Sequence, residues 1–168
     1  MFNSFIQASL EDLTNRQPTS ESEWYGTWNA ILFHLFPSEE GYIIAPQTAV
    51  RSVSNEYIIP DFYIEILKIS SPSLLKRIVA ILEIKNTPRW PSWKEKIEEQ
   101  ISKQADYAFD KSAKDIVYCI MAIGPHWEYG VKHDNGQRVQ DLIPWHEMIH
   151  DEASYKDFQH LKELVKAL

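Results

Sequence analysis

The chain has 168 residues, of which 44% are hydrophobic and 12% aromatic, and its formal net charge is −7. This length is enough for one hydrophobic core, and this aromatic content excludes a disordered chain. No stretch of about 20 apolar residues occurs, which argues against a membrane-spanning helix and a membrane partner. We expect a single domain over residues 1–168, with residues 1–18 as an N-terminal extension. The start of the chain lacks the pattern of a signal peptide, which predicts an intracellular protein of the cytoplasm or nucleus.

The net negative charge disfavours a polyanionic partner, because phosphate binding depends on lysine and arginine. The charges are unevenly distributed, however: residues 1–65 carry −7, residues 66–114 carry +4 and residues 115–168 carry −4. The positive middle third weakens the objection, although a solvated helix face would show the same pattern. The single cysteine, Cys119, lies within the apolar run IVYCIMAI and is interpreted as a buried small side chain.

Hydrophobic spacing and turn signals predict the elements of the chain. Ser-x-x-Glu sequences at 20–23 and 92–95 predict capped helix starts, and runs of β-branched and aromatic residues are typical of strands. In chain order the sequence predicts a short helix and a turn within 1–18, a helix at about 21–36, extended segments at about 42–53 and 57–69, a strand at 77–86, a helix from about 92 to 110, a strand at 115–123 and a closing helix at 155–167. Turns at 54–56 and 134–136 each predict a hairpin. This order predicts an α/β (α+β) fold, a mixed sheet flanked by helices.

Charged residues stand at the ends of two predicted strands. Asp61 follows Pro60 at the start of one strand, and Glu83 and Lys85 end the apolar run RIVAILEIKN of the other. Side chains two apart in a strand share a face, so Glu83 and Lys85 point together. Burial of unpaired charge is costly, and a bound divalent cation would explain their presence. The pattern therefore predicts a metal site.

Oxygen ligands of this kind suit Mg²⁺, with Mn²⁺ as a substitute of similar ligand preference. The carboxylates of Asp61 and Glu83 and the backbone carbonyl of Ile84 would form an open site, with water and a phosphate oxygen in the remaining positions. Such an ion lowers the pKa of its bound water, and Lys85 would orient or deprotonate that water or stabilise the developing negative charge. These residues predict phosphodiester hydrolysis.

The sequence IPDF, followed about twenty residues later by ILEIKN, resembles the PD-(D/E)XK phosphodiesterase superfamily of restriction enzymes, RecB-like exonucleases and junction resolvases. The resemblance spans roughly residues 20–125 and implies a restriction-endonuclease-like fold. It also implies that Asp61 and Glu83 bind metal and that Lys85 is the catalytic lysine. Many members add a metal-binding glutamate from the preceding helix, and Glu23 is the matching residue here. Its place in a Ser-x-x-Glu sequence gives helix capping as an equal alternative.

RecB-like members also carry a Gln-x-x-x-Tyr element on the helix after the catalytic strand, facing the site. This chain departs from that pattern, because Gln100 and Gln104 precede Tyr107 at a longer and a shorter spacing, so either glutamine fits the role. Both amides fall on the apolar face of the predicted helix, where buried amides need hydrogen-bond partners. A metal site or a substrate phosphate would provide them.

The predicted function is Mg²⁺-dependent cleavage of DNA, with DNA as the partner and a homodimer if both strands are cut. The net acidity favours an alternative, a nuclease-fold domain without catalysis that binds nucleic acid or protein. A third hypothesis is a zinc peptidase, since His146, Glu147 and His150 match H-E-x-x-H. Pro144 lies just before that motif and only a short segment follows it, which argues against the long helix that such enzymes need.

Overall fold

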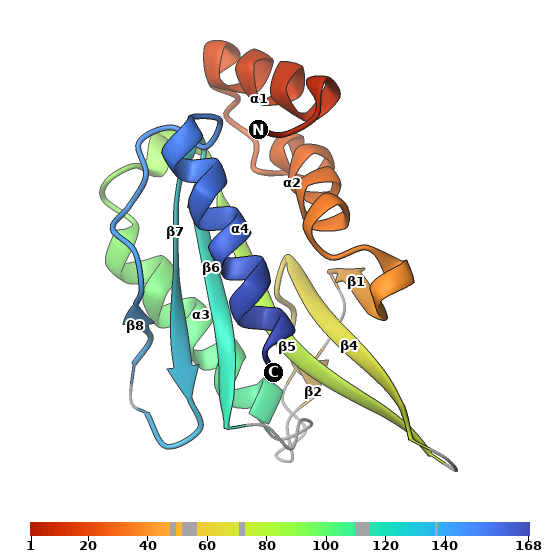
Figure 1. Cartoon of the computed structure of the whole chain (residues 1–168). Helices are drawn as coiled ribbons and strands as arrows, with labels where there is room; N and C mark the ends of the chain where they lie inside the picture. The colour runs from red at the N-terminus through yellow and green to blue at the C-terminus, as the bar shows by residue number, and fades with distance from the viewer. Residues whose placement is uncertain (48–49, 52–56, 71–72, 110–114, 137) are drawn as a thin grey trace.

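A mixed β-sheet forms the centre of the molecule (Figure 1). The computed structural model describes residues 1–47, 50–51, 57–70, 73–109, 115–136 and 138–168. Within these residues six strands lie in the order β1-β4-β5-β6-β7-β8, and β5 and β6 are parallel while the other neighbours are antiparallel. The strands are β1 (Tyr42–Pro46), β4 (Phe62–Ser70), β5 (Ser73–Lys85), β6 (Ile116–Ile123), β7 (His126–His133) and β8 (Gln140–Asp141), while β2 (Val50–Arg51) and β3 (Tyr57–Ile58) form a separate antiparallel pair.

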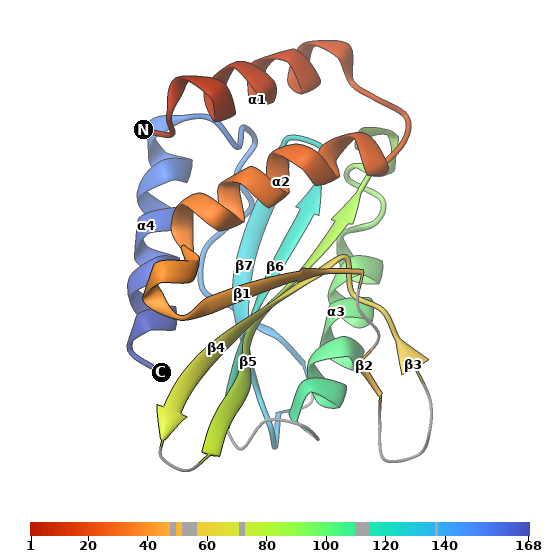
Figure 2. The same cartoon turned by 90° about the vertical axis from the view of Figure 1, so that its right-hand side faces the viewer.

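Helices cover both faces of this sheet (Figures 1 and 2). One face carries α3 (Lys94–Phe109), and the other carries α2 (Ser22–Leu35) and α4 (Glu152–Lys166), with α1 (Ser4–Arg16) packed against α2. Short 3₁₀ helices, η1 (Ser38–Glu40) and η2 (Thr87–Arg89), follow α2 and β5. In the part of the chain that the structure describes, no helix has the length and apolar character needed to cross a membrane.

The central strands are buried on both faces, because helices pack against each side. Alternate residues of β5 belong to opposite layers: Leu82 and Ile84 pack in the layer of α1, α2 and α4, whereas Ile81 packs against α3. Strands covered on both sides are typically apolar without interruption, which is the pattern of these segments. Cys119 of β6 is buried as predicted, and burial raises the pKa of its thiol.

The predicted helices are confirmed as α1, α2, α3 and α4, but the first predicted hairpin is only partly correct. Instead of running on to residue 53, the first extended segment ends as β1 at Pro46, because Gln47 has a left-handed φ of 42°. β1 pairs with β4, Tyr42 lying opposite Ile66, and β4 also pairs with β5. The predicted turn at 54–56 lies outside the described residues, between the paired strands β2 and β3.

The strand β7 was not predicted, because its sequence HWEYGVKH interrupts an apolar pattern with charges. Lys132 is nevertheless only 1% exposed, since it pairs with Asp106 of α3 at 2.9 Å and donates to the carbonyl of Gly136. Gly130 allows β8 to approach closely, because a Cβ there would lie 2.6 Å from the carbonyl oxygen of Gln140. The predicted turn at 134–136 follows β7, which pairs with β8 beyond it, so this hairpin is confirmed with β7 as its first strand.

Neither Ser-x-x-Glu sequence forms the predicted capping pair. Ser20 Oγ contacts Ser22 Oγ at 2.7 Å, and Glu21 is the N-cap residue of α2 without a side-chain cap bond. Ser92 donates to the carbonyl of Arg89 at 2.9 Å, before α3 begins. The side chains of Glu21 and Glu23 at the start of α2 instead form ion pairs, Glu21 with Lys85 and Glu23 with Arg16.

Candidate active site

The end of β5 extends past the start of β4, and this offset creates the candidate site. Phe62, the first residue of β4, lies opposite Leu82, so β4 offers Ile84 no backbone partner. The N–H of Ile84 donates instead to Oδ2 of Asp61 at 2.7 Å. This hydrogen bond holds the Asp61 carboxylate beside the strand end that carries Glu83.

Glu83 lies at the centre of a buried hydrogen-bond network between β5 and α3. Its side chain is almost fully enclosed, with 2% of the residue exposed. Lys85 Nζ lies 2.5 Å from Oε1, and the amides of Gln100 and Gln104 donate to Oε1 at 2.5 Å and to Oε2 at 2.8 Å. The sequence left open which glutamine faces the strand, and the structure places both there, one helical turn apart on α3.

Tyr25 of α2 is a residue of this site that sequence reasoning missed. Its hydroxyl donates to Oδ1 of Asp61 at 2.6 Å, so each oxygen of Asp61 accepts a hydrogen bond. Burial, and then the hydrogen bond to Asp61, raise the pKa of the Tyr25 hydroxyl, which keeps it a donor. In the sequence Tyr25 stands within an aromatic-rich helix, where no signal separates it from a packing residue.

Two glutamates near the start of α2 differ in their contacts. Glu23, the candidate from the sequence, forms an ion pair with Arg16 at 2.9 Å on an exposed part of the helix. Glu21 lies two residues earlier, and its Oε2 is 3.9 Å from Lys85 Nζ. Among the described contacts the structure therefore brings Glu21, and not Glu23, to Lys85. Side chains two positions apart along a helix point in directions that differ by about 200°, so Glu21 and Glu23 have different surroundings.

Burial and like charge both act on Glu83. Burial raises the pKa of its carboxyl, the charge of Asp61 raises it further, and Lys85 opposes both effects. Asp61 and Lys85 are each only 8% exposed, so water screens these charges little. The described residues contain no cluster of three or more His, Cys, Asp or Glu side chains suited to a metal ion. An ion at this place would therefore depend on two carboxylates together with main-chain and water ligands.

The zinc-peptidase hypothesis is wrong, because residues 146–150 do not lie in a helix. His146 forms an isolated β-bridge with Trp127, and its Nε2 lies 2.7 Å from Asp157 Oδ2. Glu147 contacts His126 Nδ1 at 3.2 Å. Residues 146–150 therefore do not hold the His146 and His150 imidazoles one helical turn apart, as an H-E-x-x-H zinc site requires.

Comparisons with known proteins bear on the fold. No protein-family model and no curated protein matches the chain. Among solved structures it is similar to a chain in the cryo-EM structure of a DrdV–DNA complex, with a TM-score of 0.58 and 16% sequence identity. The similarity covers 94% of this chain but 13% of that chain, so this chain corresponds to a small part of it. The likeness shows the fold, a restriction-endonuclease-like mixed sheet flanked by helices, and confirms the predicted fold class.

Proposed function

We propose that this chain is a metal-dependent nuclease that hydrolyses phosphodiester bonds of DNA. The observation that carries the proposal is the buried group of Asp61, Glu83 and Lys85 at the end of β5. The fold supports it, since the similar solved chain belongs to a complex with DNA. A fold by itself does not define an activity, so the proposal rests on the chemistry of the site.

The donor set fits Mg²⁺ or Mn²⁺, which take oxygen ligands. A carboxylate oxygen has about two acceptor positions. Each oxygen of Asp61 receives one donor and Oε2 of Glu83 receives one, so both carboxylates retain a position for a cation. The carbonyl of Ile84 is the third candidate ligand. The N–H and C=O of a strand residue point to the same edge, so this carbonyl faces the edge on which Asp61 lies.

The side chains have separate roles in the proposed reaction. A bound ion would lower the pKa of a coordinated water and neutralise charge on the phosphate. Asp61 and Glu83 would hold that ion, with Tyr25 and the two amides of α3 fixing their carboxylates. The Lys85 ammonium donates one hydrogen bond to Glu83, and its remaining protons orient the attacking water and stabilise charge on the scissile phosphate.

Plasmid nicking tests this proposal. The purified protein is incubated with supercoiled DNA in Mg²⁺, Mn²⁺ or EDTA, beside the Asp61→Asn and Lys85→Met variants. We expect cleavage in either metal and none in EDTA, and a loss of about 100-fold or more in each variant, the size typical of a removed catalytic group. Cleavage that survives EDTA, or that is equal in all three proteins, contradicts the assigned site.

The acidic residue that α2 contributes is tested by a matched pair of variants. Glu21→Gln and Glu23→Gln change the same charge on the same helix, two residues apart. The contact between Glu21 and Lys85 predicts that Glu21→Gln lowers the nicking rate and that Glu23→Gln spares it. The reverse result would support Glu23, the residue that matches the family resemblance.

One observation favours a second function, a nuclease-fold binding module without catalysis. Each oxygen of Asp61 and Glu83 accepts a hydrogen bond from a protein group. Thermal melting separates the two functions. A metal at ten times its Kd stabilises the folded state by about 1.4 kcal/mol, which raises the Tm of a chain of this size by about 3–6 °C. No rise in Tm together with no nicking supports the binding module.

A further inference from the structure

A groove of about 370 Å³ lies beside the Glu83 network. Its lining residues come from α3 and from the segment that follows β3: Ile59, Lys96, Glu99, Gln100, Lys103 and Gln104. Figure 2 shows α3 beside β2, and Ile59, which follows β3, is 56% exposed. Two of the lining residues, Gln100 and Gln104, also donate to Glu83, so the groove adjoins the candidate active site.

Positive charge dominates this groove beside Gln100. Lys96 and Lys103 line it, and the described structure gives neither ammonium a carboxylate partner, unlike Lys132, which pairs with Asp106. Seven helical residues rise by about 10 Å, so the two lysines lie on either side of Gln100 along α3. Because the ammonium groups of Lys96 and Lys103 have no carboxylate partner in the described structure, their positive potential favours an anion in the groove.

The positive charge continues at the start of α3. Lys96 Nζ lies 5.0 Å from the centre of the Trp93 ring, and the Arg89 guanidinium carbon lies 3.7 Å from the same ring. Arg89 Nε also donates to Oδ1 of Asn86, which directly follows β5, at 3.0 Å. Cation–π contacts fix a cation without neutralising its charge. We call Arg89, Lys96 and Lys103 the basic strip.

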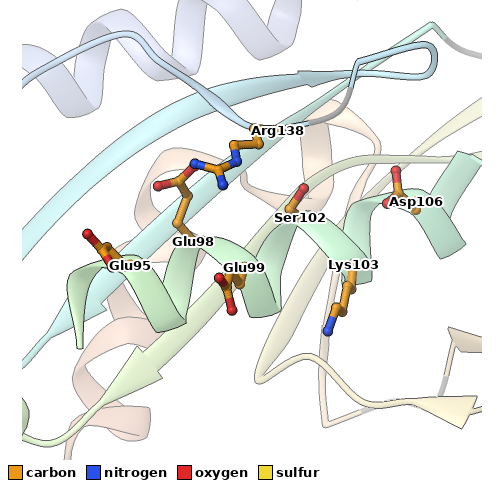
Figure 3. Close-up of a pocket in the computed structure, with 7 residues that line it drawn as sticks. All are labelled: Glu95, Glu98, Glu99, Ser102, Lys103, Asp106 and Arg138. Atoms are coloured by element: carbon orange, nitrogen blue, oxygen red, sulfur yellow. The ribbon is translucent and has the colours of Figure 1, made fainter.

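The neighbouring cavity on α3 has the opposite character. It measures about 570 Å³, and its acidic lining residues are Glu95, Glu98, Glu99 and Asp106. Figure 3 shows Glu98 and Ser102 pointing toward Arg138, while Lys103 leaves the helix on the other side. Glu99 and Lys103 line both cavities and so form the border between them. Charge therefore favours a polyanion on the side of the basic strip and repels it from the acidic side.

We propose that the groove between α3 and Ile59 binds phosphates of the DNA backbone, with Lys96 and Lys103 as the direct contacts. The inference rests on the proposed function, because it takes DNA as the ligand and the end of β5 as the place of cleavage. Lysine binds phosphate as a point charge, and each such contact releases counterions from the DNA. Glu99 lies in the same groove and opposes the phosphates, so its charge lowers the affinity.

Fluorescence anisotropy with a labelled duplex of about 25 base pairs, in EDTA, measures this binding without cleavage. The variants are Lys96→Gln, Lys103→Gln and Glu99→Gln. Lys156→Gln is the control, because it removes the same charge from an exposed site on α4, across the sheet. Each groove lysine is expected to account for about an eightfold change in affinity at about 0.1 M salt and about one unit of the slope of log K against log salt. Melting curves show that each variant is folded.

The two lysine variants are expected to bind more weakly, Glu99→Gln more tightly and Lys156→Gln like the wild type. Unchanged affinity and salt dependence in the groove variants overturns the inference, and so does an absence of binding by the wild type. Nicking assays on the same preparations separate the two proposals. Binding that depends on Lys96 and Lys103 without any metal-dependent nicking refutes the proposed function and leaves the phosphate groove in place.

Discussion

Replacing Lys85 by methionine removes the ammonium that contacts Glu83 while keeping most of the side-chain volume. The ion pair is short, at 2.5 Å, and its side chains are only 10% and 3% exposed. Loss of one partner from a fully buried pair costs about 3–5 kcal/mol, because a charge is left without compensation. Here two amides from α3 still donate to Glu83, so we expect a smaller cost of about 2–3 kcal/mol for Lys85→Met.

This loss is measured by urea unfolding, followed by tryptophan fluorescence in EDTA at pH 8. In thermal melting the same loss corresponds to a fall in Tm of about 4–12 °C for a chain of this size. Lys156→Met is the matched control, because Lys156 and its partner Glu152 are both exposed and water screens such a surface pair. If Lys85→Met loses no more stability than Lys156→Met, the ion pair with Glu83 does not hold this site together.

The sign of the pH dependence provides a second check. Burial already raises the pKa of Glu83, and Lys85 lowers it, so Lys85→Met raises the folded-state pKa further. A carboxyl with a raised pKa destabilises the fold as pH rises, since the unfolded chain releases that proton first. The stability gap between wild type and Lys85→Met is therefore expected to be widest at alkaline pH and to narrow as pH falls. Adding Glu83→Gln should recover much of the loss, because it removes the uncompensated charge.

Two further predictions concern buried polar groups away from the site. Burial, and then the charge of Asp141, raise the pKa of Glu128 from 4.5 to about 8. As pH rises, the unfolded chain therefore releases this proton before the folded chain does, and the stability of the fold decreases between pH 4.5 and 8. Glu128→Gln should therefore gain stability relative to the wild type as pH rises from 5 to 8, and a difference in Tm that does not grow with pH contradicts this. Ser154 accepts from Trp127 Nε1 at 2.6 Å and is fully buried, so Ser154→Ala should cost about 2–3 kcal/mol in urea unfolding. An unchanged unfolding midpoint would show that the indole finds another partner.

Much of the architecture was predictable because it follows from local patterns. The runs at 77–86 and 115–123 are apolar on both faces, and such strands are stable only where helices cover both sides of a sheet. The strand β7 was not predictable in this way, because its buried Lys132 is paired with Asp106, a residue of another element, and donates to the carbonyl of Gly136 beyond the strand. The end of β1 could not be predicted from the sequence either, since the left-handed conformation of Gln47 carries no clear sequence signal.

That Glu83 and Lys85 point to the same side follows from the amino-acid sequence alone, because alternation is a local property of an extended strand. The kinds of groups present follow from it as well: carboxylates, a lysine and two amides on one helix face. Which helical residues meet that strand end depends on how the helices pack in the folded chain. The rotation of a helix about its axis is set by how its apolar face packs on the sheet, and a single residue changes the direction of a side chain by about 100°. That packing placed Tyr25 on Asp61, both glutamines on Glu83, and Glu21 in place of Glu23 beside Lys85.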